Sequence, residues 1–480
     1  MKKWAIVFLV SMCAVSAHAQ RRSSYVNMPV NISVWKGYSI GDLIAKDKKI
    51  INYVSINLLK SEAAKLRGFE AGLLTNEYTE DVFGIQTAGL ANIGHDKGMG
   101  IQIAGLANVI DGYHGIQIAG LANVVDEGFT GIQIGGLAGV VDGPGEGIQL
   151  SGLANITDGS FHGFQVSGLA NVIDGVGRGI QLSTLANIVD ENFLGIQVSG
   201  LANVVDGEGK GTQISGLANI VDGGFHGFQV GGLANVIDGG GRGIQVSGLA
   251  NIVDENFIGI QASGLANVID GDGKGIQLSG LASVVDGNYF GIQASGLANV
   301  TDGEFRGLQA GLLNVAETIE MGVQAGVINK SDYDGVIPIG IASFVDDTPT
   351  YIDVWKDEGR FLYTGFRSGT KTIYNVAFLG VEINDPFRWS LGWEIGLHRD
   401  VSEKGYLETG IGAQHINENE FWTSEKNMLG SFKVIGGWQL TDTMSLYAGP
   451  TLNYFISEVH DGSDLTSWSM SDEKSGAKWK

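Results

Sequence analysis

The sequence predicts an all-β protein in which an array of 16-residue units forms a β-solenoid and an antiparallel β-barrel-like module follows it. Three observations support this fold class. One short phrase recurs through the middle of the chain, 75 glycines and frequent Val and Ile accompany only 6 prolines, and the segments after Tyr351 alternate polar and apolar residues. Such a composition is typical of turn-rich β structure and differs from that of collagen-like and disordered chains.

Residues 1–19 predict a secretory signal peptide. Two lysines precede an apolar run from Trp4 to Val15, and the small-residue pattern Ala17-His18-Ala19 provides a cleavage site after it. The mature protein is therefore expected to leave the cytoplasm. The one cysteine, Cys13, lies within the leader, so disulfides and thiolate metal sites are excluded from the mature chain.

Charge and hydropathy narrow the classes of partner. The formal net charge of -22 at pH 7 argues against nucleic-acid binding, and the cations between Gly100 and Glu304 are too sparse for a phosphate-binding stripe. No segment after the leader approaches the ~20 apolar residues of a transmembrane helix, so any insertion into a membrane would have to use β-strands.

The N-terminal segment, residues 20–67, alternates polar and apolar residues from Val30 to Leu59 and is expected to form strands that cap the array. The array itself, residues 68–330, opens with a degenerate repeat in which Glu70 occupies the place of glutamine. Glutamines then recur at intervals of 16 residues, with two intervals of 15. They are Gln86, Gln102, Gln117, Gln133, Gln149, Gln165, Gln181, Gln197, Gln213, Gln229, Gln245, Gln261, Gln277, Gln293, Gln309 and Gln324.

Each repeat is expected to form two short strands, Ile-Gln-Val and Leu-Ala-Asn-Val-Val, with a Ser-Gly corner between them and an Asp-Gly turn after them. Two late repeats have one residue fewer between Gln and Asn, and a corner absorbs a deletion that would reverse the faces of a continuous strand. Stacked coils place Gln above Gln and Asn above Asn, where amides can hydrogen-bond along the stack, while Val, Ile and Leu columns fill the interior. The positions assigned to these columns are Gln102, Asn108, Gln165, Asn171, Gln197, Asn203, Gln229, Asn235, Gln261, Asn267, Gln293 and Asn299.

An antiparallel meander, or a large barrel made from it, is the alternative for the array. A column of stacked aspartates would repel itself, and Asp-Gly is a strong hairpin signal. The turns also carry alternately an aromatic residue, such as Phe161, and a glycine, such as Gly177. This alternation indicates either a duplicated 32-residue unit or turns that lie at opposite ends of antiparallel strands.

Residues 331–350 form a junction that contains the segment Pro338 to Val345, and residues 351–480 form the C-terminal module. Its segments of about ten alternating residues, rich in Trp and Tyr, match the strands of outer-membrane barrels, with a soluble antiparallel sandwich as the alternative. No closing aromatic strand precedes Lys480, which leaves open whether the module is complete at its C-terminus. The expected strands are Arg360–Arg367, Thr372–Ile383, Trp389–His398, Tyr406–His415, Leu429–Leu440 and Met444–Ile456.

Several phrases of the chain resemble a group of largely uncharacterised surface repeat proteins, which are secreted proteins of Bacteroidetes with relatives among the spirochaete surface-repeat proteins. The likeness covers nearly the whole mature chain and the order of its parts. It implies a location in the cell envelope and brings no known catalytic residue or ligand. The phrases are Gly-Ile-Gln-Ile-Ala-Gly-Leu-Ala-Asn-Val at 100–109, Gly-Val-Gln-Ala-Gly-Val-Ile-Asn at 322–329, Pro338-Ile339-Gly340-Ile341-Ala342-Ser343-Phe344-Val345 and Phe366-Arg367-Ser368-Gly369.

No catalytic residue, cofactor or metal site is predicted. The segment 206–212 superficially resembles a phosphate-binding loop but lacks consecutive Gly-Lys-Ser/Thr, and its Lys210 is expected to be a variable turn residue. His162 and His226 occupy equivalent turns, which copying explains better than zinc binding. Stacked Asp-Gly turns could hold calcium, but carboxylates that accept N–H bonds from their own turns are preferred, because each coil offers only one acid.

These observations predict a non-enzymatic cell-envelope surface repeat protein of a Gram-negative-type bacterium, with a structural, adhesive or binding role and an anchoring C-terminal β module. The expected partners are the outer membrane and an unidentified protein or glycan surface. The alternative is an outer-membrane pore or transporter in which the repeats form part of one large barrel. A carbohydrate-active enzyme on a solenoid would need clustered carboxylates and aromatics, which the repeats do not supply.

Overall fold

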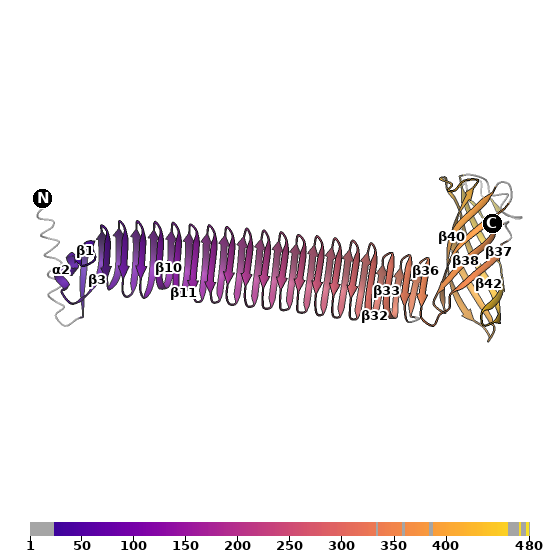
Figure 1. Cartoon of the computed structure of the whole chain (residues 1–480), viewed down its shortest axis with the longest axis horizontal. Coiled ribbons are helices and arrows are strands. Elements are labelled where there is room, and N and C mark those ends of the chain that lie inside the picture. Colours follow the sequence, from indigo (N-terminus) through magenta and orange to yellow (C-terminus); the bar gives the residue numbers. More distant parts are fainter. Residues whose placement is uncertain are drawn as a thin grey trace. The chain divides into compact units, whose positions relative to one another are not determined.

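A computed structural model describes residues 24–332, 335–357, 361–383, 387–458, 470–471 and 477–479 (Figure 1). Strands make up 73% of the chain and helix 1%, which confirms the predicted all-β class. The predicted signal peptide lies outside the described residues. The chain separates into two compact units, residues 1–248 and residues 249–480, and each is described by itself.

The first unit is built from coils of two strands each. β19 (Phe193–Ser199) and β20 (Ala202–Val205) form one coil, and each pairs in parallel with the corresponding strand of the next coil, β21 (Gly209–Ser215) and β22 (Ala218–Val221). Gln197 lies beside Gln213, and Asn203 lies beside Asn219. The predicted β-solenoid is therefore confirmed, since a meander would require antiparallel neighbours.

The other elements of the first unit follow the same alternation after a short N-terminal region. They are β1 (Tyr25–Trp35), β2 (Tyr38–Ser39), α2 (Ile40–Ala45), β3 (Lys49–Asn57), β4 (Lys60–Ala63), β5 (Lys65–Gly72), β6 (Thr75–Tyr78), β7 (Val82–Ala88), β8 (Ala91–Gly94), β9 (Lys97–Ala104), β10 (Ala107–Ala119), β11 (Ala122–Gly135), β12 (Ala138–Asp142), β13 (Gly145–Ser151), β14 (Ala154–Asp158), β15 (Phe161–Ser167), β16 (Ala170–Ile173), β17 (Gly177–Ser183), β18 (Ala186–Val189), β23 (Phe225–Gly231), β24 (Ala234–Ile237) and β25 (Gly241–Ser247).

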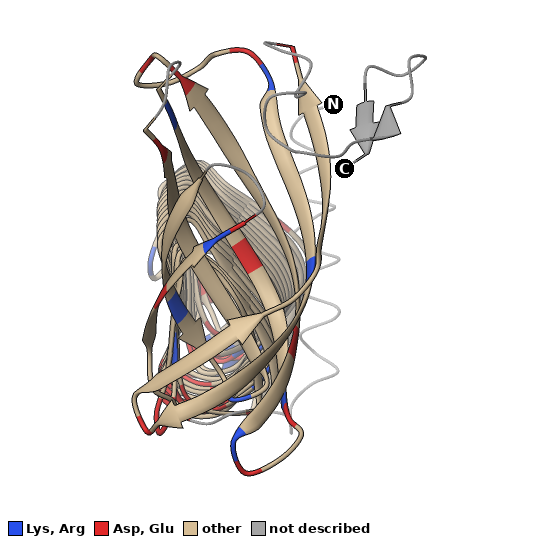
Figure 2. Cartoon of the chain, turned by 90° about the vertical axis from the view of Figure 1, so that its right-hand side faces the viewer, with Lys and Arg blue, Asp and Glu red and all other residues tan. Residues whose placement is uncertain are grey.

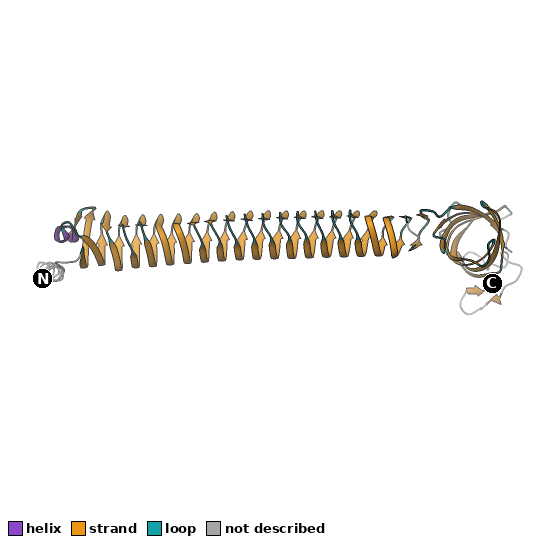
Figure 3. Cartoon of the chain, turned by 90° about the horizontal axis from the view of Figure 1, so that it is seen from below, coloured by secondary structure: helices purple, strands orange, loops and turns teal. Residues whose placement is uncertain are grey.

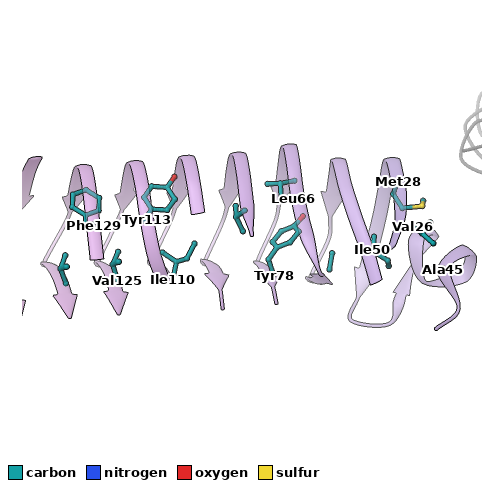
Figure 4. Close-up of a cluster of buried hydrophobic side chains, with 13 residues drawn as sticks. Val26, Met28, Ala45, Ile50, Leu66, Tyr78, Ile110, Tyr113, Val125 and Phe129 are labelled. Atoms are coloured by element: carbon teal, nitrogen blue, oxygen red, sulfur yellow. The ribbon is translucent and has the colours of Figure 1, made fainter. Parts of the chain in front are cut away.

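The solenoid begins before residue 68, because β1 pairs in parallel with β3 and β3 pairs in parallel with β5. The helix α2 lies between β2 and β3 and was not predicted. Its first turn is closed by a capping box, in which the Asp42 N–H donates to Ser39 Oγ at 3.0 Å and the Ser39 N–H donates to Asp42 Oδ2 at 2.9 Å. Ile40 and Ile44 of α2 pack against the buried apolar cluster at this end of the unit (Figure 4).

Aromatic residues and glycines alternate inside the solenoid for a packing reason. Phe161 and Phe193 are the first residues of their strands and are buried, and Gly177 lies between them in the same column. A Cβ atom added to Gly177 would stand 2.8 Å from Phe193 Cδ2. The prediction that these residues lie in turns was wrong. Each aromatic ring fills the space above a glycine of the neighbouring coil, and this packing explains the 32-residue period.

Only part of the predicted apolar filling lies inside. The second branched residue of each Val-Val pair is buried, with Val205 and Val221 at 0% exposure, but the Leu column faces outward, with Leu201 at 43%. The interior therefore consists of Phe or Gly, Gln, Ser, Asn and Val or Ile columns. Figure 4 shows some of its apolar side chains, such as Ile110 and Val125 from successive coils. The prediction that leucines fill the interior was wrong because the corner turns their side chains away from it.

A second glycine column lies within the first strands of the coils. Gly195 has a φ of 147°, and a Cβ atom there would stand 1.9 Å from the carbonyl oxygen of Gly179 in the neighbouring coil. Glycine is the residue that tolerates this close approach of two backbones.

The second unit also begins with solenoid coils. The deletion in its late repeats is absorbed at the corner, as predicted, because Gln293 lies beside Gln309 and Asn299 lies beside Asn314, although the later repeat has one residue fewer between Gln and Asn. Further along the same pair of strands the register shifts between Thr301 and Glu304 and between Phe305 and Arg306. The predicted junction is itself a coil: β35 pairs in parallel with β33, and β36 with β34. The strands are β26 (Ala250–Val253), β27 (Phe257–Ser263), β28 (Ala266–Ile269), β29 (Gly273–Ser279), β30 (Ala282–Val285), β31 (Tyr289–Ser295), β32 (Ala298–Ala310), β33 (Leu313–Ala325), β34 (Ile328–Ser331), β35 (Val336–Ile339) and β36 (Ala342–Val345).

A ten-stranded antiparallel sheet follows and curves into a half-barrel (Figures 2 and 3). Its order is β37-β38-β39-β40-β41-β42-β44-β46-β45, and β43 also pairs with β42. The predicted strand from Met444 to Ile456 is divided at Gly449-Pro450, and its halves pair with different ends of β42. The bounds are β37 (Tyr351–Lys356), β38 (Leu362–Gly369), β39 (Ile373–Glu382), β40 (Arg388–Asp400), β41 (Gly405–Glu418), β42 (Asn427–Thr441), β43 (Met444–Ala448), β44 (Thr451–Ser457), β45 (Met470–Ser471) and β46 (Ala477–Trp479).

The close approach of glycine backbones gives a first prediction. Gly195→Ala should lower the free energy of unfolding by about 2 kcal/mol or more, because the methyl group meets the backbone of the next coil and the positive φ is strained. Denaturant unfolding followed by circular dichroism measures the change. Gly112→Ala is the control, since a Cβ atom there meets nothing closer than Lys97 Cγ at 3.5 Å. Equal loss of stability in both variants would contradict the explanation.

Candidate functional site

The glutamines predicted to stack form a buried hydrogen-bond ladder. In the first unit, Gln102 Nε2 donates to Gln86 Oε1 at 2.7 Å, and the same bond recurs from each glutamine to the one before it. The bonds of the assigned positions are Gln165 to Gln149 at 2.7 Å, Gln197 to Gln181 at 2.7 Å and Gln229 to Gln213 at 2.8 Å, and in the second unit Gln277 to Gln261 and Gln293 to Gln277, both at 2.9 Å.

The asparagines form a second ladder with the opposite direction. Asn108 Nδ2 donates to Asn123 Oδ1 at 2.8 Å and also to the Ile118 carbonyl at 2.9 Å, so each asparagine holds both the next asparagine and the next corner. The assigned positions continue the pattern: Asn171 to Asn187 at 2.9 Å, Asn203 to Asn219 at 2.9 Å, Asn219 to Asn235 at 2.8 Å, Asn251 to Asn267 at 2.9 Å and Asn299 to Asn314 at 2.8 Å.

The glutamine ladder begins at a buried carboxyl group. Glu70 is 0% exposed, and it accepts from Gln86 Nε2 at 3.1 Å, from Ser61 Oγ at 3.0 Å and from Asn57 Nδ2. Burial raises the pKa of Glu70 above its ordinary value, while the three donors oppose that shift. The repeat pattern identifies Glu70 as a variant of the glutamine position. The role of Glu70 as the end of the ladder is visible only in the three-dimensional structure.

The asparagine ladder is interrupted at two coils. Gly139 and Ser283 occupy asparagine positions, and the next asparagine along the chain, Asn155 or Asn299, has an Oδ1 atom without a hydrogen-bond partner among the described residues. Both asparagines are buried, so each lost donor leaves a polar atom unsatisfied in the interior.

The predicted aspartate column lies at the exposed turn edge. Asp142 and Asp158 are register partners on neighbouring strands. The charges of Asp142 and Asp174 raise the pKa of Asp158, and the neighbouring charges of Asp174 and Asp206 add to the effect of burial in raising that of Asp190. The repulsion that favoured a meander in the sequence analysis is therefore present, and the solenoid forms in spite of it.

The outer faces of the coils are largely apolar. In the first unit the Leu column is 39–44% exposed, and Ile156 and Ile196 are each 41% exposed. From β12 onward in the first unit, the Lys and Arg side chains are Arg178, Lys210 and Arg242, and each is the second residue of a first strand. This polarity is the reverse of an ordinary soluble core, because amides lie inside and branched aliphatic side chains lie outside.

The C-terminal sheet shows the same inversion. Its concave side holds buried ion pairs: Arg367 donates to Asp353 at 2.8 Å and to Glu408 at 2.6 Å, and Lys433 donates to Glu394 at 2.7 Å. Figure 2 shows that charged residues are few along the strands and gather near their ends. A cavity of about 570 Å³ lies among these groups, lined by Asp353, Trp355, Arg367, Phe378, Glu394 and Lys433. Large apolar side chains are exposed on the strands, among them Leu379, Leu391, Leu397, Ile411, Phe432 and Leu452.

The junction phrase and the sheet are fastened to each other within the second unit. Asn375 Nδ2 donates to the Pro338 carbonyl at 2.7 Å, and its Oδ1 accepts from the Gly340 N–H at 3.2 Å. Trp393 Nε1 donates to the Gly340 carbonyl at 2.6 Å, and the Ser343 N–H donates to Ser368 Oγ at 2.9 Å. The last coil is therefore held by side chains of the sheet rather than by a flexible linker.

The fold does not bring the other candidate residues, Lys210, His162 and His226, together in one site. Lys210 is the second residue of β21, and His162 and His226 occupy the same outward column on β15 and β23, so none of them is the turn residue that was expected. No group of three or more His, Cys, Asp or Glu side chains in the described part of the chain could hold a metal ion. No helix among those residues is long and apolar enough to cross a membrane.

No family model matches the chain, and neither a curated protein nor a solved structure matches it.

The interrupted ladder gives the second prediction. Gly139→Asn should raise the free energy of unfolding by about 1–3 kcal/mol, because the new amide donates to Asn155 Oδ1 and restores the column. Denaturant titration measures the gain. Gly139→Ala is the control, since it reduces backbone freedom in the same way but brings no amide. If alanine stabilises as much as asparagine, the ladder is not the cause.

The aspartate column gives the third prediction. Because the folded-state pKa of Asp158 is raised by its neighbours, its contribution to stability is complete below the ordinary pKa and is lost as pH rises through the folded value. Asp158→Asn should therefore raise the melting temperature at pH 7 and have a smaller effect below pH ~4 or in high salt. Glu146→Gln is the control, because Glu146 lies between Thr130 and His162 rather than between acids. A gain for Asp158→Asn that does not depend on pH would contradict the repulsion.

Proposed function

We propose that this protein is an exported, non-enzymatic surface protein of the cell envelope, whose C-terminal sheet inserts into the outer membrane and whose solenoid has a structural or adhesive role. The observation that carries the proposal is the polarity of the C-terminal sheet. Its ion pairs lie on the concave side, and its exposed strand positions hold large aliphatic and aromatic side chains.

Such a sheet is suited to the hydrocarbon core of a lipid bilayer. Leu379, Leu391 and Leu397 are each about half exposed, and Ile411 is 64% exposed, so water would meet a broad apolar surface. In a bilayer those side chains would face lipid, while the charged pairs would stay on the inner side. Backbone hydrogen bonds between neighbouring strands are satisfied within the sheet, and in a bilayer its two edge strands, β37 and β45, would be paired with each other or with another sheet edge.

The solenoid supports a binding or structural role rather than transport. Its interior is filled by Gln, Asn and Phe or Val columns, and its strands pair in parallel, so the repeats are not strands of a large antiparallel barrel. Its outer surface repeats the same features coil after coil, which is suited to multivalent contact with a partner. The anchored half-barrel and the junction bonds of Asn375 and Trp393 would hold that surface to the membrane.

The fourth prediction tests the anchor in the full chain, expressed with its leader in cells that possess an outer membrane. The wild-type protein should sediment with outer membranes and resist extraction by alkaline carbonate. The double variant Leu391→Arg and Ile411→Arg should lose most of that association, because an arginine on a lipid face costs about 2–4 kcal/mol near the bilayer centre.

Leu194→Arg is the matched control, because the equivalent positions of neighbouring coils already hold Arg178 and Lys210. It should remain with the membrane, and its melting temperature should fall only slightly, because the new cation lies between Arg178 and Lys210. Recovery of the wild-type protein in the soluble fraction, or equal loss for the control, would overturn the anchoring proposal.

A further inference from the structure

The second strands of the coils in the first unit present a uniform apolar face, which we name the Leu–Ala–Val face. Three outward columns compose it, and one residue of each comes from every coil between Leu90 and Val236. In the two preceding coils the alanine and valine positions hold Lys60, Glu62, Thr75 and Glu77. The columns are Leu90, Leu106, Leu121, Leu137, Leu153, Leu169, Leu185, Leu201, Leu217 and Leu233; Ala91, Ala107, Ala122, Ala138, Ala154, Ala170, Ala186, Ala202, Ala218 and Ala234; and Ile93, Val109, Val124, Val140, Ile156, Val172, Ile188, Val204, Ile220 and Val236.

The uniformity of this face is not required by the core, because all three columns point away from it. It is also not explained by repeat copying. The first strands carry three outward columns, and one of them has diverged from coil to coil: it holds Glu146, His162, Arg178, Leu194 and Lys210 in consecutive register. The other two hold mainly Ile or Phe, as at Ile196, and Val, Leu or Ile, as at Val198. The repeats have therefore varied at one exposed column, while the three columns of the Leu–Ala–Val face kept their apolar side chains.

The shape of the Leu–Ala–Val face fits a second copy of itself. Leu201, Ala202 and Val204 make a ridge, a groove and a ridge along the solenoid axis, and Asp206 borders the face on the turn side. We infer that this face pairs with the same face of a second copy, with the two solenoids parallel. The valine ridge of each copy then lies in the alanine groove of the other.

Charge selects the parallel arrangement. A two-fold axis parallel to the solenoid axis reverses the order of the columns in the second copy. The valine column of each copy then faces the alanine column of the other. The aspartate column of each copy lies next to the leucine column of the other. An axis across the solenoid would instead place the columns of Asp142, Asp158 and Asp174 against their own copies. Those carboxylates already repel one another within one chain, so that second arrangement is disfavoured.

The size of the face is near the lower limit of a standard interface. A strand of four residues spans ~13 Å, and neighbouring coils are ~4.8 Å apart. Ten coils therefore offer a flat area of roughly 600 Å² per partner, and the uneven surface of the side chains adds to this area. A standard interface takes about 800 Å² from each partner. The pairing does not require membrane insertion, although two chains anchored in one membrane would have the orientation that it needs.

The first test measures mass in the purified full chain by light scattering in a mild detergent. The wild type should have the mass of two chains, and the double variant Ala170→Arg and Ala202→Arg should have the mass of one, a two-fold change. The control Leu194→Arg adds the same charge to the opposite strand face and should stay dimeric. Circular dichroism and melting temperature confirm that the variants fold. A monomeric wild type, or a dimeric double variant that folds normally, overturns the proposal.

The second test reads the orientation on intact cells, because the mature chain has no cysteine. Single variants Ala122→Cys, Ala170→Cys and Ala234→Cys are treated with a short bismaleimide. Parallel copies bring each coil beside the same coil of the partner, so all three should form cross-linked dimers, while Leu194→Cys should not. Cross-linking at one of the three or at none would overturn the parallel pairing. Because membrane association is measured separately, either result leaves the anchoring proposal independently testable.

Discussion

The structure depends on hydrogen bonds between side-chain amides of successive coils. A buried glutamine or asparagine is costly unless its N–H and C=O groups find partners, and in this interior the available partner is the same residue one coil away. Gln197 bonds to Gln181 at 2.7 Å and Asn203 bonds to Asn219 at 2.9 Å only when the coils stack in one register. A shift by one residue would leave buried amides unpaired along every coil. The ladders therefore specify register more sharply than apolar packing alone, which tolerates exchange among Val, Ile and Leu.

Amide columns share the interior with buried Val, Ile and Phe columns, while other aliphatic residues face outward. The strand alternation that points Asn203 and Val205 inward points Ala202 and Val204 outward, so one strand supplies both the interior and the apolar exterior. The C-terminal sheet reaches a similar polarity by other means, with paired charges on its concave side. Arg367 is partly buried, with 14% of its side chain exposed, and makes ion pairs with Asp353 and with the buried Glu408, so the charges are compensated where they are removed from water.

The sequence was sufficient to predict the features that recur locally. The period of the glutamines predicted coils and ladders, and the corner explained the shortened repeats. The alternation of Phe161 and Gly177 was read as turn chemistry because one strand does not show what lies above it, and only the stacked coils reveal that the ring occupies the space over the glycine. The leucines were assigned to the interior because hydrophobic residues are usually buried, a rule that fails when amides occupy the core. The bonds of Asn375 to Pro338 and Gly340 join residues that are distant in sequence, and no local pattern signals them.

The ends of the ladders show that their direction is fixed chemically. Glu70 accepts from Gln86 Nε2 at 3.1 Å, so the NH₂ group of Gln86 faces Glu70, and Gln86 then offers its oxygen to Gln102. Each later glutamine inherits that orientation. The asparagine ladder runs the other way and ends where Asn329 Nδ2 meets the Ser343 hydroxyl at 3.2 Å, a group that can accept. Each ladder thus has an end residue whose hydrogen-bonding capacity matches the amide beside it, as a capping residue matches the free N–H groups of a helix. Without such an end, either orientation of the glutamine amides would satisfy their amide-to-amide bonds, whereas each asparagine is also oriented by its bond to a corner carbonyl, as Asn108 is by Ile118.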